Sequence, residues 1–304
     1  MIIENIGPFI LFFIIVELIM NFFKKLTNDK TFFIAEIGIN HNGNLEKAIK
    51  LIESAKLAGC DVVKFQKRTP ELCIPKDQWN IKRKTPWGNI KYIDYKKKIE
   101  FGKKEYDKIN KYCKKLNILW TASCWDIPSI KFIKKYNVKF YKIASASITD
   151  KYLLKEIKKT NKPVIISTGM STEKQISNAV KIIGQKNLAI LHCNSSYPAP
   201  SKQLNLRYIK TLQKKYKNSV IGYSGHEMNL SSSIAAIVLG AKIVERHITL
   251  DKSLWGTDQR ASIEPLGFAR LIRDARTVEE SLGYNKKIVY PEELNIMKKL
   301  RKSF

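Results

Sequence analysis

Short β-branched runs alternate with amphipathic stretches along the chain from Phe32 onward. In a typical amphipathic stretch, NLEKAIKLIESAKLAG, the apolar residues share one helical face and Gly59 ends the helix. Strands that alternate with helices predict parallel strands in repeated βα units. The eight predicted strands are residues 32–38, 61–66, 117–123, 139–145, 163–169, 187–193, 219–225 and 241–247.

Eight such units in about 250 residues have the count and size of an α/β protein with the (β/α)8 TIM-barrel fold. A doubly wound open sheet is the alternative. It would more often carry a glycine-rich phosphate loop after its first strand, and none follows residues 32–38. We therefore expect a hydrophobic N-terminal extension over residues 1–31, a barrel domain over residues 32–283 and a tail over residues 284–304.

Each predicted strand begins with apolar residues and ends with polar ones. In the strand AKIVERH, Ile243, Glu245 and His247 share one face, and Arg246 on the other face is interpreted as an outer salt-bridge partner. The carboxyl ends of barrel strands converge on one face of the molecule, where active sites are built. The other polar strand ends are Glu36, Lys64, Gln66, Ser123, Lys142, Ser145, Ser167, Thr168, His192, Ser224 and His226.

Two of these strand ends carry lysines, Lys64 and Lys142, and several others carry serines. Such a cationic, hydroxyl-rich socket suits a phosphorylated or carboxylated anion, because ammonium and hydroxyl donors satisfy its oxygens at low dielectric. The alternative is that both lysines pair internally with Glu36 and Glu245 and bind no ligand.

His226 and His247 end neighbouring predicted strands. Two imidazoles are a reasonable partial shell for a divalent cation, which water and ligand oxygens would complete. The alternative is that both are loop histidines whose ring nitrogens form hydrogen bonds within the fold.

The formal charge of +28 would suit a polyanion partner. However, the lysines are scattered through amphipathic stretches such as KYLLKEIKKT, so we favour a solvated lysine surface and expect no nucleic-acid partner. The five cysteines are widely spaced and contain no C-x-x-C pair. This argues against a disulfide framework and favours a reducing compartment, so we expect a cytoplasmic protein.

Residues 6–23, IGPFILFFIIVELIMNFF, are almost wholly apolar. Their length is borderline for a membrane span, and Glu17 within them would cost about 2.5–3.5 kcal/mol on insertion. No small-residue cleavage site follows, which argues against a cleaved signal peptide. Three interpretations stay open: membrane contact through residues 6–23, translation that starts at Met20, and an extra helix packed on the main domain.

Several specific stretches, in order and one for almost every strand, give the chain a resemblance to the sialic acid synthase family over about residues 32–283. The resemblance implies condensation of phosphoenolpyruvate with an N-acylated amino sugar aldehyde, such as N-acetylmannosamine, to give a sialic-acid-type nonulosonic acid and phosphate. It also implies a Mn²⁺ or Mg²⁺ ion and a homodimer. The stretches are IAEIGINHNGNLEKA, VVKFQ, YKIAS, VIISTGMST, LHCNSSYPAP, IGYSGHE and VERHITLDKSLWGTDQRASIEP.

The resemblance implies roles for individual residues. Glu36 matches the acid/base carboxylate, and His226 and His247 match the two metal ligands. We expect Glu245 to balance buried positive charge. Ser147 departs from the pattern, because many relatives carry a glutamate there. Lys64, Ser123, Lys142, Ser145, Ser167, Ser195 and Ser224 match the phosphoenolpyruvate-binding positions; Glu36, Gln66, Tyr197 and Asp258 match the sugar-binding positions; Glu36, Lys64, Lys142 and Glu245 form the expected catalytic set.

Longer relatives carry an antifreeze-like domain after the barrel, whereas residues 283–304 resemble only the linker to it, as in a short form of the family. The insertion over residues 69–102 is long for a βα connection, and we predict that it covers the sugar site with Trp79 or Trp87 as a platform. Two other classes stay open. One is a Schiff-base aldolase that uses a barrel lysine, Lys142 or Lys64, as nucleophile. The other is a non-catalytic basic barrel that binds a polyanion or membrane.

Overall fold

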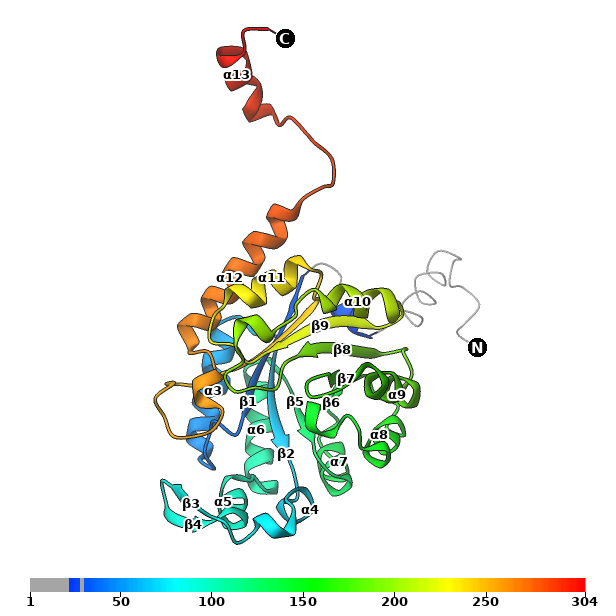
Figure 1. Cartoon of the computed structure of the whole chain (residues 1–304). Coiled ribbons are helices and arrows are strands. Elements are labelled where there is room, and N and C mark those ends of the chain that lie inside the picture. Colours follow the sequence, from blue (N-terminus) through cyan, green and yellow to red (C-terminus); the bar gives the residue numbers. More distant parts are fainter. Residues whose placement is uncertain (1–21, 28–29, 304) are drawn as a thin grey trace, which may run out of the picture.

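The computed structural model describes residues 22–27 and 30–303, and eight parallel strands within them close into a barrel (Figure 1). Around the barrel the order is β1-β10-β9-β8-β7-β6-β5-β2. Each barrel strand pairs with the barrel strands that precede and follow it in the chain, and β1 pairs with β10 to close the ring. The predicted TIM barrel is confirmed. Its strands are β1 (Phe32–Gly38), β2 (Val62–Lys67), β5 (Leu119–Cys124), β6 (Tyr141–Ile143), β7 (Val164–Ser167), β8 (Leu188–Cys193), β9 (Val220–Gly225) and β10 (Ile243–His247).

Amphipathic helices surround the barrel, and side-chain caps define where several of them begin. Asn44 accepts a hydrogen bond from the Lys47 amide, and Asp126 accepts one from the Ser129 amide. The first helix of the ring ends before Gly59, whose φ of +90° favours glycine. The ring comprises α3 (Leu45–Leu57), α6 (Lys103–Lys115), α7 (Ile127–Lys134), α8 (Lys151–Lys158), α9 (Glu173–Ile183), α10 (Tyr208–Lys215), α11 (Ser231–Val238) and α12 (Pro265–Leu282).

Alternate residues of each strand serve two separate apolar cores. Outward-facing residues such as Val63 and Val244 pack against the helices. Inward-facing residues such as Val62 and Ile243, together with Phe140, fill the half of the barrel interior near the amino ends of the strands. This division follows from the two-residue period of a strand. The half near the amino ends of the strands is called the lower half here, and the half near the carboxyl ends of the strands is called the upper half. The upper half of the interior is left to the polar strand ends.

The short helix α2 (Phe22–Leu26) closes the lower end of the barrel. Phe23 is fully buried, with its ring centroid 5.6 Å from that of Phe140. A helix packed on the main domain therefore describes this end of the apolar segment, while residues 6–21 lie outside the described residues. No helix among the described residues is long and apolar enough to cross a membrane.

The insertion over residues 69–102, here called the lid, follows β2 and so lies at the carboxyl end of the strands (Figure 1). It forms structure that the sequence did not predict, including an antiparallel hairpin. Trp79 was one of two predicted platforms, but its indole nitrogen donates to the Ile74 carbonyl within the lid, so it is engaged in holding the lid together. The lid contains α4 (Pro70–Cys73), η1 (Lys76–Gln78), β3 (Lys82–Thr85), β4 (Gly88–Lys91) and α5 (Tyr92–Ile99).

After α12 the chain extends away from the barrel and ends in α13 (Pro291–Leu300), which has no buried residues (Figure 1). Three further single turns lie in the loops above the strands. They are η2 (Ser145–Ser147), η3 (Ser201–Gln203) and η4 (Gln259–Ala261).

Candidate active site

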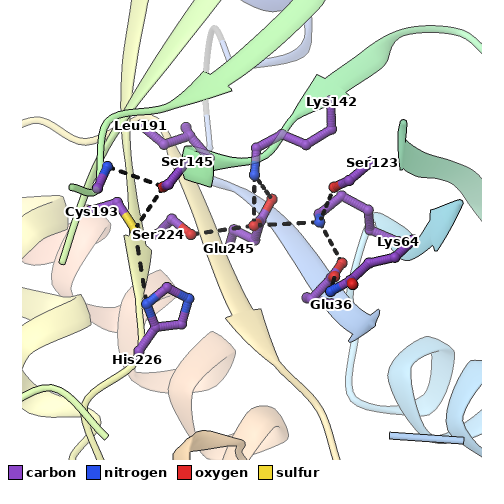
Figure 2. A network of polar contacts seen from close by, with 12 residues as sticks. Glu36, Lys64, Ser123, Lys142, Ser145, Leu191, Cys193, Ser224, His226 and Glu245 are labelled. Carbon is purple, nitrogen blue, oxygen red and sulfur yellow. Dashed lines mark hydrogen bonds and ion pairs between the residues drawn. The ribbon is translucent and has the colours of Figure 1, made fainter. Parts of the chain in front are cut away.

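Four buried charged side chains form one ion-pair network at the carboxyl end of the barrel strands (Figure 2). Lys64 Nζ lies 2.5 Å from Glu36 Oε2 and 3.6 Å from Glu245 Oε1. Lys142 Nζ donates to both carboxylate oxygens of Glu245, at 2.8 and 3.0 Å. None of the four is more than 4% exposed, so the charges interact with little screening by water. The internal pairing considered as an alternative from the sequence is thus present.

Strand register explains why residues so distant in the sequence meet at this level. Adjacent parallel strands place residues of matching register side by side, and the strand period turns every second one inward. The network therefore consists of inward-facing residues from four strands, staggered in register: Glu245 pairs with Ile34 of β1, and Lys64 pairs with Thr121 of β5. The register pairs are Glu36 with Lys64, Glu36 with His247, Glu245 with Ser224 and Ser123 with Lys142.

The network shifts the pKa values of its two carboxyl groups in opposite directions. Burial raises the pKa of Glu36, and nearby Glu245 adds to the rise although Lys64 opposes it. Burial would also raise the pKa of Glu245, but Lys142 and Lys64 lower it to about 2. Burial would lower the pKa of Lys64, but Glu245 and Glu36 outweigh burial and raise it, whereas burial lowers the pKa of Lys142. Glu245 is thus a fixed anion, and Glu36 is the carboxyl group suited to exchanging a proton.

Serine hydroxyls line a cavity of about 170 Å³ beside the network. Ser123 Oγ accepts from Lys64 Nζ at 2.9 Å, and Ser224 Oγ donates to Glu245 at 3.2 Å. Ser167 Oγ is buried in the cavity wall without a hydrogen-bond partner among the described residues. An unsatisfied buried hydroxyl is costly, so its presence at a cavity favours a ligand that completes it.

Gly169 keeps space open between two of these hydroxyls. Its amide donates to Ser145 Oγ at 3.1 Å. A methyl group at this position would overlap Ser195 Oγ and lie 2.8 Å from Ser145 Oγ. The backbone therefore approaches the cavity as only glycine allows.

The two predicted metal ligands lie side by side on the other wall of the cavity. The ring centroids of His226 and His247 are 5.4 Å apart. His226 Nδ1 lies 2.6 Å from the Asn194 carbonyl, which fixes the proton there and leaves Nε2, 2.8 Å from the Tyr197 hydroxyl, as an acceptor. His247 Nδ1 is buried without a hydrogen-bond partner among the described residues.

These features fit a divalent cation. Metal-binding imidazoles commonly donate their second nitrogen to a carbonyl, as His226 does, and an orphaned buried nitrogen such as that of His247 is available as a ligand. Burial and then His226 lower the pKa of His247 well below its usual value, so its ring is neutral. The pKa of His226 is raised, because Cys193 and the Asn194 carbonyl outweigh burial. No cluster of three or more His, Cys, Asp or Glu side chains in the described part of the chain is placed to hold a metal, so the protein would supply two nitrogens.

The three residues matched to sugar contacts surround Glu36 and the imidazoles. Gln66 Nε2 donates to Glu36 Oε1 at 3.1 Å. The Tyr197 ring stacks on His226 with centroids 4.1 Å apart. Asp258 Oδ2 lies 3.7 Å from His247 Nδ1, beyond hydrogen-bond distance. A ligand that contacts all three would therefore reach the acid/base carboxyl and the histidine pair together.

The structure brings almost every predicted site residue to this one cavity; Asp258 alone is not among the lining residues, although its carboxylate lies 3.7 Å from His247 Nδ1. The cavity also contains residues that sequence reasoning missed. Cys193 follows the inward parity of β8, which could have identified it, whereas the others stand in loops without a periodic signal. The missed lining residues are Trp125, Ala144, Ala146, Met170 and Cys193.

Other polar strand-end residues turn away from the cavity. Arg246 is fully buried outside the barrel, where it pairs with Glu227 at 2.9 Å, so its predicted role as an outer salt-bridge partner is confirmed. His192 Nε2 lies 2.6 Å from the Leu204 carbonyl. His41 stacks on Phe101 at 4.0 Å between centroids. These two histidines are satisfied by the fold.

Comparison with known proteins agrees with this geometry. The family model described as the NeuB family matches residues 51–287. The chain is 39% identical over 279 residues to human N-acetylneuraminate-9-phosphate synthase, spanning 90% of this chain and 77% of that protein. It is 36% identical over 277 residues to the N,N'-diacetyllegionaminic acid synthase of Campylobacter jejuni, spanning 88% and 82%.

Among solved structures, the sialic acid synthetase of Leptospira borgpetersenii serovar Hardjo-bovis, in complex with citrate, superposes with a TM-score of 0.79. The two are 32% identical, and the match covers 91% of this chain and 94% of that one. The resemblance found in the sequence is therefore confirmed. The chain belongs to the NeuB family of synthases, enzymes that form a carbon–carbon bond by condensation.

Proposed function

We propose that this protein condenses phosphoenolpyruvate with an N-acylated amino sugar aldehyde to give a nonulosonic acid and inorganic phosphate. The observation that carries the proposal is the buried layer of Glu36, Lys64, Glu245 and Lys142 beside the paired imidazoles. Two ammonium groups, two carboxyl groups with opposite pKa shifts and two available nitrogens meet at one cavity. Family membership narrows this chemistry to condensation.

Phosphoenolpyruvate would be held by charge and by fixed hydroxyl donors. Lys64 and Lys142 supply the ammonium groups, and the unpartnered Ser167 hydroxyl and those around Gly169 supply hydrogen bonds to its oxygens. An incoming anion also competes with Glu245 for the lysines. Because these donors are preorganised and buried, they stabilise charge that develops during the reaction.

Glu36 is the proposed proton carrier at both steps. The terminal carbon of the enol phosphate attacks the aldehyde carbon to form the new C–C bond, and Glu36 gives its proton to the aldehyde oxygen. Water then adds to the resulting oxocarbenium carbon and loses a proton to the Glu36 carboxylate. The hydroxyl group of this adduct then gives its proton to the departing phosphate as the C–O bond breaks, which leaves a ketone and inorganic phosphate. The Gln66 amide, 3.1 Å from Glu36 Oε1, orients the carboxyl group throughout.

His226 and His247 would hold a Mn²⁺ or Mg²⁺ ion. When bound, such an ion supplies Lewis-acid polarisation of the aldehyde oxygen. The remaining work falls to the side chains around it. Tyr197 stacks on His226, and the Asp258 carboxylate lies 3.7 Å from His247 Nδ1, and both would orient sugar hydroxyls beside the reacting carbon.

The function is tested by phosphate release from phosphoenolpyruvate with a panel of amino sugars, with and without chelator. We expect release that requires an amino sugar, is lost with chelator and returns with Mn²⁺ or Mg²⁺. Sugar-independent release, or none with any amino sugar, would contradict the proposal. Full activity in His247→Ala would remove the metal assignment while leaving the condensation intact.

The relatives include both a 9-phosphate synthase and a diacetyllegionaminic acid synthase, so the panel includes phosphorylated and diacetamido sugars. The homodimer, the cytoplasmic location and membrane contact through residues 6–23 stay predictions. Light scattering of the purified protein tests the first.

A Schiff-base aldolase makes a different prediction for the same lysines. Lys142 Nζ is held by both oxygens of Glu245, and Lys64 Nζ lies between two carboxylates. These carboxylates stabilise the ammonium forms against the free amine that a Schiff base requires, and for Lys142 they oppose the effect of burial. Borohydride with pyruvate should trap no lysine adduct. A non-catalytic polyanion-binding barrel would show steep salt dependence of binding and no turnover.

A further inference from the structure

The lid and the loop that follows β10 form one aromatic wall beside the sugar end of the site. The Tyr95 ring, in helix α5 of the lid, meets Trp255 edge to face at 5.2 Å between centroids. Trp87 of the lid lies 6.3 Å from the same indole. Trp255 stands three residues before Asp258 in the same loop, so the lid packs directly on the segment that carries this proposed sugar contact.

Two cations stand on this wall without acidic partners. Lys96 Nζ lies 5.3 Å from the Tyr92 ring centroid and 5.2 Å from that of Tyr95, and the lysine is half-buried. The Arg83 guanidinium lies 4.6 Å from the same Tyr92 ring. Within the described residues, no carboxylate forms an ion pair with either cation. Aromatic faces hold a cation in place but leave its charge unneutralised.

The wall also presents an unused hydroxyl toward Asp258. The Tyr95 side chain is 3% exposed, and its hydroxyl has no hydrogen-bond partner among the described residues. Burial and then Asp258 raise the pKa of this tyrosine, so it keeps its proton and can donate. Burial and then Arg68 lower the pKa of Lys96 to about 8, although Asp258 and Glu100 oppose the shift, so an anion bound beside this ammonium group would stabilise its charge.

We propose that Lys96 and Arg83 bind a phosphate group at the end of the sugar opposite the aldehyde, so that the enzyme prefers a phosphorylated amino sugar. This inference rests on the function proposed above. An open-chain hexosamine with its aldehyde beside Glu36 and His247 would run past Asp258, which lies 3.7 Å from His247, toward the lid helix that packs on the same loop. A phosphate dianion there supplies the missing counter-ion to Lys96.

The test compares kcat/KM for a 2-acetamido hexose 6-phosphate and for the same sugar without phosphate. Lys96→Gln should lower the value for the phosphorylated sugar by about 10- to 100-fold, the range for losing one charge-assisted hydrogen bond. The value for the free sugar and the KM for phosphoenolpyruvate should stay the same, and Lys96→Arg should retain most of the preference. Lys97→Gln is the matched control on the same helix, because Lys97 pairs with Glu71 at 2.7 Å.

Equal losses for both sugars in Lys96→Gln, or a wild type that prefers the free sugar, would overturn the phosphate site and leave the condensation standing. If neither sugar is turned over, the proposed function fails instead. Calorimetric binding of the phosphorylated sugar to wild type and Lys96→Gln then decides the phosphate site by itself. Weaker binding by the variant supports the site, and equal or undetectable binding refutes it.

Discussion

The upper and lower halves of the barrel interior are built from the same strands yet differ completely in chemistry. Along the inward face of a strand, one step of two residues changes Ile34 to Glu36 in β1, and Ile243 to Glu245 in β10. The lower layer is apolar and closed by α2, whereas the upper layer holds the ion-pair network. Stability and chemistry are thus assigned to opposite ends of one scaffold.

The lower layer should carry stability with little influence on catalysis. Phe140→Ala removes a ring that packs against Phe23 at 5.6 Å between centroids and should lower the free energy of unfolding by about 3–5 kcal/mol. Urea denaturation measures this loss. Phosphate release per folded molecule should stay within a few fold of wild type. A large loss of activity with unchanged stability would break the division between the layers.

The upper layer should show the reverse. Lys64→Met removes the cation between Glu36 and Glu245, and we expect turnover to fall by about 100- to 1,000-fold, as for loss of one preorganised donor. One carboxyl group can take up a proton to relieve the repulsion, which moderates the effect on folding. Steady-state kinetics and thermal unfolding together test this, and near-normal turnover would contradict the assignment.

Acidification should lower the free energy of unfolding through His41. Burial lowers the pKa of His41 to about 3, whereas an unfolded histidine titrates near 6.5, so the unfolded chain binds more protons between these values. Stability from this residue is complete above about pH 6.5 and falls by about 2 kcal/mol on acidification to pH 5. Between about pH 6.5 and pH 5, urea denaturation should show a smaller change in the free energy of unfolding for His41→Gln than for the wild type. Equal differences would refute this origin.

Gly169→Ala should weaken the binding of phosphoenolpyruvate and leave the binding of the sugar unchanged. The added methyl group displaces the Ser195 hydroxyl and crowds that of Ser145. Because one hydrogen bond is lost, the KM for phosphoenolpyruvate should rise about tenfold. The KM for the sugar should not change, and parallel increases in both values would place Gly169 outside the phosphoenolpyruvate site.

The regular part of the molecule could be predicted because its pattern is dictated by burial. All eight barrel strands and the inward parity of Lys64 and Glu245 follow from strand periodicity. The hairpin of β3 and β4 could not be predicted, because its residues KRKT and GNIK are largely exposed and carry no alternating apolar signal. Nor does any local pattern indicate that Tyr95 of the lid meets Trp255 of the loop after β10, since that depends on how the lid folds back.

The most direct test of the upper layer as a phosphoenolpyruvate condensation site follows a single oxygen atom. Phosphoenolpyruvate labelled with ¹⁸O in its bridging C–O–P position is incubated with the enzyme and an amino sugar, and both products are analysed by mass spectrometry. We predict that the label leaves in inorganic phosphate, only when the sugar is present, and that Lys142→Met suppresses the reaction. Label retained in the sugar acid, or phosphate released without sugar, would contradict it.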